Sequence, residues 1–84
     1  MRLLELMTTE GCHLCEQATP LLVAGLDPNL FEVDLVDIAF DDQLMNLYAT
    51  RIPVLVDNQS GAELDWPFDM QQLAEFVESL KTLT

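Results

Sequence analysis

Positive charge is the scarcest property of this sequence. Its 84 residues include only Arg2, Arg51 and Lys81 as lysine or arginine, against 15 aspartates and glutamates, and the formal net charge is −12 at pH 7. Proteins hold nucleic-acid phosphates with lysine and arginine, so this balance excludes nucleic acid as a partner. A solvated acidic surface is the simplest explanation, and a preference for basic protein partners is the functional alternative.

Long apolar runs are also missing. No segment approaches the roughly 20 apolar residues of a membrane-spanning helix, so no membrane contact is expected. Residues 1–7 are too short for a secretory signal peptide and are interrupted by Arg2 and Glu5. We therefore expect one domain over residues 1–84, monomeric and cytoplasmic. Hydrophobic residues make up 50% of the chain, which indicates a folded globule.

Residues that hold metals are few. The only cysteines are Cys12 and Cys15, and the only histidine, His13, lies between them. A structural zinc ion takes four ligands, and the sequence has no second C-x-x-C and no paired histidines. Covalent haem attachment needs a histidine directly after the second cysteine, where this chain has Glu16. The sequence therefore favours a site without metal.

The cysteine pair is the most informative feature that is present. Its C-x-x-C spacing suits a reversible disulfide, and at a helix start the backbone N–H groups and the helix dipole favour a thiolate on Cys12. As a permanent crosslink, so short a loop contributes only about 2 kcal/mol, against ~4–5 kcal/mol for a loop of about 100 residues. The sequence therefore favours a redox dithiol, with a metal site, a structural bridge and inert thiols as alternatives.

Hydrophobic periodicity predicts the element order βαβαββα. Strands are expected at residues 2–7, 31–35, 54–56 and 62–66, and helices at residues 14–24, after Asp41 or Asp42, and after Asp69. The polar run 57–61 is expected to connect the last two strands as a hairpin. The first two strands should pair in parallel through a right-handed crossover, and the hairpin should add an antiparallel pair, with helices on both faces.

Local signals predict where the first two helices end and which faces they bury. Gly25 is expected to cap the first helix at its C-terminal end, and Pro20 to kink it. The second helix is expected to carry Leu44, Leu47 and Tyr48 on one face.

The last helix has the clearest signature. Asp69 is the expected N-cap, Gln72 completes a capping box three residues later, and Phe68 is placed to pack against Leu73. We expect an apolar core face made of Met70, Leu73, Phe76, Val77 and Leu80.

A C-x-x-C directly after the first strand of a βαβαββα chain resembles the thioredoxin superfamily, and the absence of an extra N-terminal strand and helix resembles its glutaredoxin branch. The segment Arg-Ile-Pro-Val at 51–54 is similar to that family's x-Val/Ile-Pro segment, in which a cis proline faces the C-x-x-C. With Cys-His-Leu-Cys at 12–15 and Trp-Pro-Phe-Asp at 66–69, the chain resembles the glutaredoxin-like family of short bacterial proteins. The resemblance implies an α/β thioredoxin-like fold with a four-stranded mixed sheet and helices on both faces.

The resemblance also implies residue roles. Cys12 would be the nucleophile and Cys15 the resolving thiol, while Ile52 and Pro53 would offer their backbone to an extended thiol substrate. His13 is a candidate for proton transfer near the substrate, with an exposed histidine that has no such role as the alternative.

Arg51 is a further candidate substrate-binding residue. Arg51 directly precedes the Ile-Pro segment that should face Cys12, so its guanidinium would favour the Cys12 thiolate and hold a substrate carboxylate or carbonyl. The alternative is an exposed arginine, or one that pairs with the many carboxylates nearby.

Three departures from the family pattern affect the choice of reductant. Glutathione-using glutaredoxins have a lysine three residues before the first cysteine, where this chain has Thr9, and a Gly-Gly turn where this chain has Trp-Pro-Phe-Asp at 66–69. Of the residues that would contact glutathione, only Asp69 remains in this chain, and its role as a helix cap already explains its presence. Glutathione is anionic, so an acidic protein without that lysine should bind it poorly. Thioredoxins also bury an acid near the cysteines, where this chain has Leu6.

The sequence therefore predicts a small dithiol–disulfide oxidoreductase with no tightly bound cofactor. Its substrates would be protein or small-molecule disulfides, and its reductant is not identified by the sequence. The alternative from a different class is a non-enzymatic redox sensor or adaptor on the same fold.

Overall fold

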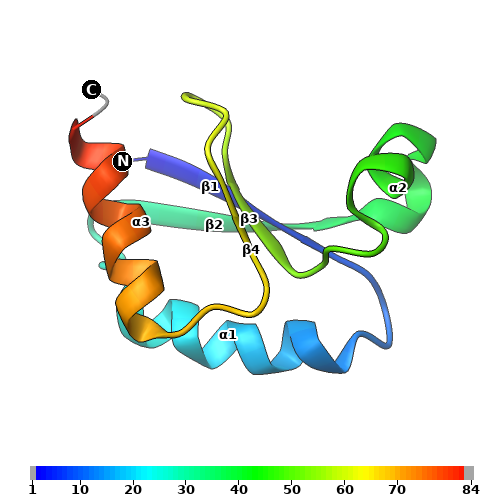
Figure 1. Cartoon of the computed structure of the whole chain (residues 1–84), viewed down its shortest axis with the longest axis horizontal. Helices are drawn as coiled ribbons and strands as arrows, with labels where there is room; N and C mark the ends of the chain where they lie inside the picture. The colour runs from blue at the N-terminus through cyan, green and yellow to red at the C-terminus, as the bar shows by residue number, and fades with distance from the viewer. Residues whose placement is uncertain (1, 83–84) are drawn as a thin grey trace.

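Strands and helices alternate in the order βαβαββα, as the periodicity predicted (Figure 1). The computed structural model describes residues 2–82. The elements are β1 (Arg2–Thr8), α1 (His13–Gly25), β2 (Phe31–Asp37), a 3-10 turn η1 (Ile38–Phe40), α2 (Asp42–Tyr48), β3 (Val54–Asp57), β4 (Glu63–Asp65) and α3 (Met70–Thr82). Within residues 2–82, no helix is both long and apolar enough to cross a membrane.

The four strands form one mixed sheet in the order β2-β1-β3-β4. Strand β1 is parallel to β2, with Arg2 opposite Phe31 and Thr8 opposite Asp37. On its other edge β1 is antiparallel to β3, and β3 is antiparallel to β4. The predicted parallel crossover and terminal hairpin are both confirmed, although β4 is only 3 residues long, shorter than predicted.

Side chains that alternate along the strands build a core on each face of the sheet. On one face, Leu4, Leu6 and Leu55 pack in a cluster with buried residues of α1 and α3. On the other face, the residues from the strands, η1 and α2 are Met7, Val54, Val56, Ile38 and Tyr48. The prediction of helices on both faces is confirmed, and Figure 1 shows α1 running below the sheet with α3 and α2 at its opposite ends.

The predicted caps of α2 and α3 are present. Asp69 Oδ1 accepts from the Gln72 N–H at 2.8 Å, and Gln72 Oε1 accepts from the Asp69 N–H at 3.0 Å, which completes the capping box. Phe68 and Leu73 lie in the same core cluster, as the predicted staple requires. At α2, Asp41 is the cap, and its Oδ1 accepts from the Gln43 N–H at 2.9 Å.

Gly25 does not cap α1, contrary to the prediction. It is the last residue of the helix, and Leu26 is the cap, with an N–H that bonds the Leu22 carbonyl at 2.9 Å. A Cβ atom on Gly25 would lie 2.5 Å from Cδ2 of Leu73. The glycine therefore permits close approach of α1 and α3, which a local sequence signal does not distinguish from a cap.

Two residues predicted on apolar core faces are exposed instead. Leu47 is 58% exposed because α2 is only 7 residues long and buries Tyr48 as its main anchor. Met70 is 43% exposed at the start of α3, where its terminal methyl lies beside Gly25 at the end of α1. Both positions fit helical spacing, which reports the apolar face of a helix and not which parts of that face other elements cover.

Asp57 is the buried charge that the sequence pattern missed. It had been predicted as the start of the hairpin connection, yet it ends β3 with no exposed surface. Arg2 donates two hydrogen bonds to the Asp57 carboxylate, from Nε to Oδ1 at 3.1 Å and from a terminal nitrogen to Oδ2 at 2.7 Å. The Ser60 hydroxyl donates to Oδ2 at 2.6 Å. Chiefly through the Arg2 bond, the pKa of Asp57 is lowered to about 2.

We expect Asp57→Asn to lower the free energy of unfolding by about 2 kcal/mol at neutral pH, since the Arg2 guanidinium loses the buried carboxylate with which it pairs. The pKa of Asp57 is depressed in the folded protein, so this contribution is complete above the unfolded pKa of about 4. It is lost as the pH falls toward the folded pKa of about 2. Urea denaturation of the oxidised protein between neutral and acid pH measures the difference.

The matched control for this pair is Asp34→Asn, which removes an exposed carboxylate from β2. It should change the free energy of unfolding by less than about 0.5 kcal/mol. A pH-independent loss in Asp57→Asn would contradict the assignment of its stability to the ionised pair.

Candidate dithiol site

A glycine turn places Cys12 at the start of α1. Strand β1 ends at Thr8, and the Cys12 N–H bonds back to the Thr9 carbonyl at 3.3 Å. Between them Gly11 has a φ of 80°, in the left-handed region that other residues rarely adopt. The chain therefore reverses within one turn and delivers Cys12 to the helix N-terminus.

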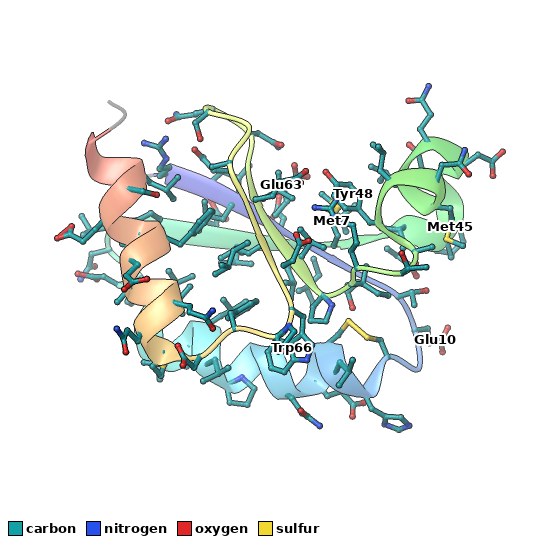
Figure 2. All side chains as sticks on the ribbon, viewed as in Figure 1. Met7, Glu10, Met45, Tyr48, Glu63 and Trp66 are labelled. Carbon is teal, nitrogen blue, oxygen red and sulfur yellow. A yellow bond between two sulfur atoms is a disulfide. The ribbon has the colours of Figure 1, made fainter. Side chains whose placement is uncertain are left out.

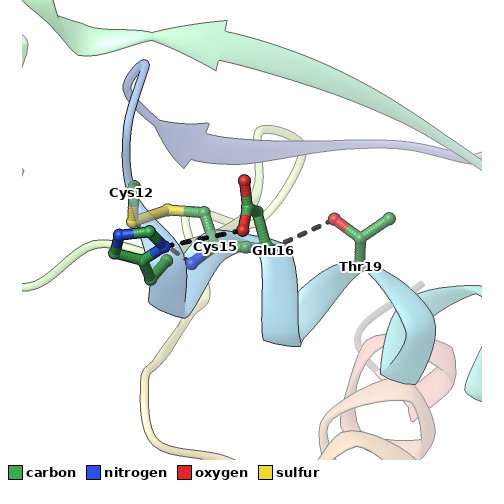
Figure 3. The surroundings of a disulfide bond; sticks show 5 residues. Cys12, Cys15, Glu16 and Thr19 are labelled. Atoms are coloured by element: carbon green, nitrogen blue, oxygen red, sulfur yellow. Dashed lines mark hydrogen bonds and ion pairs between the residues drawn. A yellow bond between two sulfur atoms is a disulfide. The ribbon is translucent and has the colours of Figure 1, made fainter.

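Cys12 and Cys15 form a disulfide with their Cα atoms 5.3 Å apart (Figure 3). Cys12 is the N-cap of α1, and its Sγ accepts a hydrogen bond from the Cys15 N–H at 3.2 Å. Cys12 is half-buried, whereas Cys15 is only 6% exposed. A thiolate on Cys12 would meet the same N–H and the positive end of the helix, so the geometry favours Cys12 as the more reactive thiol.

A hollow of about 250 Å³ lies beside the disulfide. Leu6 of β1, Leu35 of β2 and Thr19 of α1 form part of its wall. The charged residues that line it are Glu10 and Glu16, and no cationic side chain of the described residues is among its lining. We call this space the dithiol hollow. Its carboxylates oppose thiolate formation and repel anionic substrates.

His13 lies outside this hollow. Its side chain is 90% exposed, and its Nδ1 is 3.7 Å from Glu16 Oε2, an ion pair only when the imidazole is protonated. The structure therefore matches the alternative of an exposed histidine, and His13 remains a prediction as a substrate-facing residue.

The Ile52–Pro53 peptide bond is cis, as the resemblance implied. Pro53 is fully buried, and its carbonyl accepts from the Trp66 N–H at 3.1 Å. The Ile52 N–H donates to the Tyr48 carbonyl at 3.0 Å, so it is not free to donate to a substrate. Neither Ile52 nor Pro53 lines the dithiol hollow. The Trp66–Pro67 bond is also cis, which no sequence signal had indicated.

Arg51 is engaged with carboxylates of β4. One terminal nitrogen of its guanidinium lies 2.6 Å from Glu63 and 2.8 Å from Asp65, both on β4. Its Nε adds a bond to Asp65 at 3.0 Å, and its Cζ lies 5.1 Å from the centre of the Tyr48 ring. The structure thus shows the alternative in which Arg51 pairs with nearby carboxylates.

The Tyr48 hydroxyl completes this cluster by donating to Glu63 at 2.6 Å. That hydrogen bond is the main reason why the pKa of Tyr48 is raised to about 12. The bonds to Tyr48 and Arg51 lower the pKa of Glu63, and the bond to Arg51 lowers that of Asp65. Figure 2 shows Tyr48 and Glu63 together on one side of the sheet and Trp66 on the other. Through this cluster, Tyr48 of α2 and Arg51, in the loop that leads to Pro53 (the proline loop), both contact β4.

Residues 3–78 match the family of the glutaredoxin-like domain (DUF836). The chain belongs to this family. No curated protein matches it.

The glutaredoxin-like chain is also similar to solved structures. An X-ray structure of the structural genomics target XcR50 from X. campestris is 37% identical with a TM-score of 0.79, and the match covers 90% of this chain and 96% of that one. The solution structure of Ne2328 from Nitrosomonas europaea is 30% identical with a TM-score of 0.75, covering 89% of both chains. These relatives share the overall fold of this chain.

In the reduced glutaredoxin-like protein, we expect iodoacetamide to alkylate Cys12 roughly tenfold faster than Cys15 at neutral pH, since the helix N-terminus lowers the pKa of the Cys12 thiol and raises its thiolate fraction, while Cys15 is buried. Peptide mapping by mass spectrometry after limiting reagent measures both sites. Cys12→Ser and Cys15→Ser give the rate of each thiol alone. Faster labelling of Cys15 would reverse the assigned roles.

We expect Arg51→Ala to leave the alkylation rate of Cys12 unchanged, because the guanidinium is held by β4. The variant should lose about 1–2 kcal/mol of unfolding free energy, the sum of two partly exposed ion pairs and a cation–π contact. Arg51→Lys keeps the charge but not the two-pronged geometry, so it should recover only part of the loss. Slower alkylation with unchanged stability would instead support a role beside the thiolate.

Proposed function

We propose that the protein is a dithiol–disulfide oxidoreductase that reduces disulfides through Cys12. The observation that carries this proposal is the Cys12–Cys15 disulfide at the N-terminus of α1, with the half-buried Cys12 sulfur bonded to the Cys15 N–H. A helix N-terminus favours the thiolate that exchange requires. Membership of the glutaredoxin-like family supports the same chemistry.

The exchange balances in two steps. The Cys12 thiolate attacks one sulfur of the substrate disulfide, forms a mixed disulfide and releases the other substrate sulfur as a thiolate, which takes a proton from solvent. The Cys15 thiolate, whose proton goes to solvent, then attacks Cys12 Sγ and releases the second substrate thiolate. Two electrons pass to the substrate, and the protein is left with the Cys12–Cys15 disulfide, the oxidised form described above.

An external dithiol is the proposed electron donor, with no tightly bound cofactor. Glutathione is a poor candidate because it is anionic, while Glu10 and Glu16 line the dithiol hollow and Thr9 stands where glutathione-using relatives have lysine. Leu6 forms an apolar wall of the hollow in place of a buried acid. The proton of Cys15 must therefore leave through solvent in the hollow.

We expect reduction of oxidised mercaptoethanol with a thioredoxin-reductase system as electron source, and at least roughly tenfold slower turnover with glutathione, since charge repulsion disfavours its approach. Coupled oxidation of NADPH measures both reactions. Cys12→Ser should abolish turnover, and Cys15→Ser should stop after one mixed disulfide. Saturable, efficient turnover with glutathione would contradict the donor assignment, and inert thiols with either donor would favour a sensor or adaptor.

A further inference from the structure

An apolar groove of about 400 Å³ separates α1 from the sheet edge at β2. Its walls include Leu22 and Val23 from α1, the C-cap residue Leu26, and Phe31, Val33 and Leu35 from β2. Val23 is 77% exposed and Leu35 is 69% exposed, so water reaches the apolar rim. Exposed apolar side chains that gather around one concave space are typical of a binding site, whereas isolated ones are ordinary surface.

The apolar groove and the dithiol hollow adjoin each other, and we call the two together the depression. Leu6, Thr19 and Leu35 line both spaces. A molecule whose disulfide reaches Cys12 can therefore place a neighbouring apolar group in the groove without leaving the surface. Figure 3 shows Thr19 and Glu16 on the side of α1 that faces the strands, between the disulfide and the rest of the helix.

Charge is distributed unevenly along this depression. Glu10 and Glu16 line the end beside the disulfide, and among the residues that the structure describes no charged one lines the groove end. Arg2 and Arg51 do not neutralise these carboxylates, because Arg2 is paired with Asp57 and Arg51 with β4. The complementary substrate is thus cationic beside its disulfide and apolar a short distance away.

We infer that the substrate is a disulfide-bearing polypeptide segment with a basic residue beside its cysteine and an apolar side chain that occupies the groove. The inference rests on the proposed function. A polypeptide fits better than a compact small molecule, because within residues 2–82 β2 is the terminal strand of the sheet, and a terminal strand offers main-chain hydrogen-bonding groups to an extended segment. Cys12 attacks the segment's disulfide as described, and two peptide thiols are released.

The test compares peptide homodimers, each joined by one disulfide between identical short peptides. One peptide carries lysine and leucine near its cysteine, a second has serine in place of the leucine, and a third has glutamate in place of the lysine. Pre-reduced protein is mixed with each dimer, the reaction is quenched with acid, and chromatography measures the free peptide thiol. Oxidised mercaptoethanol provides a reference rate for the dithiol itself.

We expect the lysine–leucine dimer to react roughly tenfold faster than the serine dimer, the effect of one apolar group in a matching pocket. The glutamate dimer should also react more slowly, and this difference should shrink at high salt because charge effects are screened. The leucine effect should persist at high salt.

Variants locate the effect on the protein. Val23→Gln and Leu35→Thr should each reduce the leucine preference by several-fold when every peptide rate is divided by the reference rate. Leu47→Gln is the matched control, since it changes a 58% exposed leucine on α2, and should leave the preference unchanged. For charge, Glu16→Gln should weaken the lysine preference, and Glu32→Gln, an exposed carboxylate elsewhere on β2, should not.

Two results would overturn the inference in distinguishable ways. Equal rates for the leucine and serine dimers, with normal reduction of oxidised mercaptoethanol, would remove the groove from substrate binding and leave the oxidoreductase function intact. Failure to reduce oxidised mercaptoethanol would overturn the proposed function and the inference together.

Discussion

The position of the dithiol depends on β1 being paired along both edges. Its seven residues match β2 in parallel from Arg2 to Thr8, and the residues from Leu4 to Met7 match β3 in antiparallel register. A one-residue slip would exchange the two faces of the strand, moving Leu6 out of one core and Met7 out of the other. The end of β1 is therefore fixed on both sides. The glycine turn follows it directly, so the position of Cys12 is fixed as well.

Ion pairing inside the fold determines the charge around the site. Arg2 joins the first strand to the end of β3 through Asp57, and Arg51 joins the proline loop to β4 through Glu63 and Asp65. Both arginines are thus paired with carboxylates inside the fold, and neither offsets the other negative charges of a protein whose net charge is −12. In the proposed exchange, the reactivity of Cys12 rests on the helix terminus and the Cys15 N–H, because the carboxylates of the hollow act against the thiolate.

Local chemistry explains which parts of the fold were predictable from the sequence. The Asp69–Gln72 capping box and the Cys12 helix start involve residues three positions apart, so the chain itself determines them. Gly25 and Asp57 were misread because their partners, Leu73 and Arg2, are 48 and 55 residues away in sequence. Hydrophobic periodicity reports which face of a helix is apolar, but it does not report how much of that face is covered, and Met70 is 43% exposed.

The same distinction applies to the site. The cysteine pair was recognisable because the C-x-x-C spacing by itself allows a disulfide. Arg51 was predicted to lie near the cysteines because it is close to Pro53 in sequence, but its guanidinium pairs with β4. The groove had no sequence signal, because Leu6 and Phe31 also read as ordinary core residues of their strands. Only the tertiary arrangement shows that α1 leaves Leu35 uncovered beside the disulfide. The buried apolar residues of α1 and the sheet hold these elements in place on either side of Leu35. The packing that stabilises the sheet therefore also shapes the surface available to a substrate.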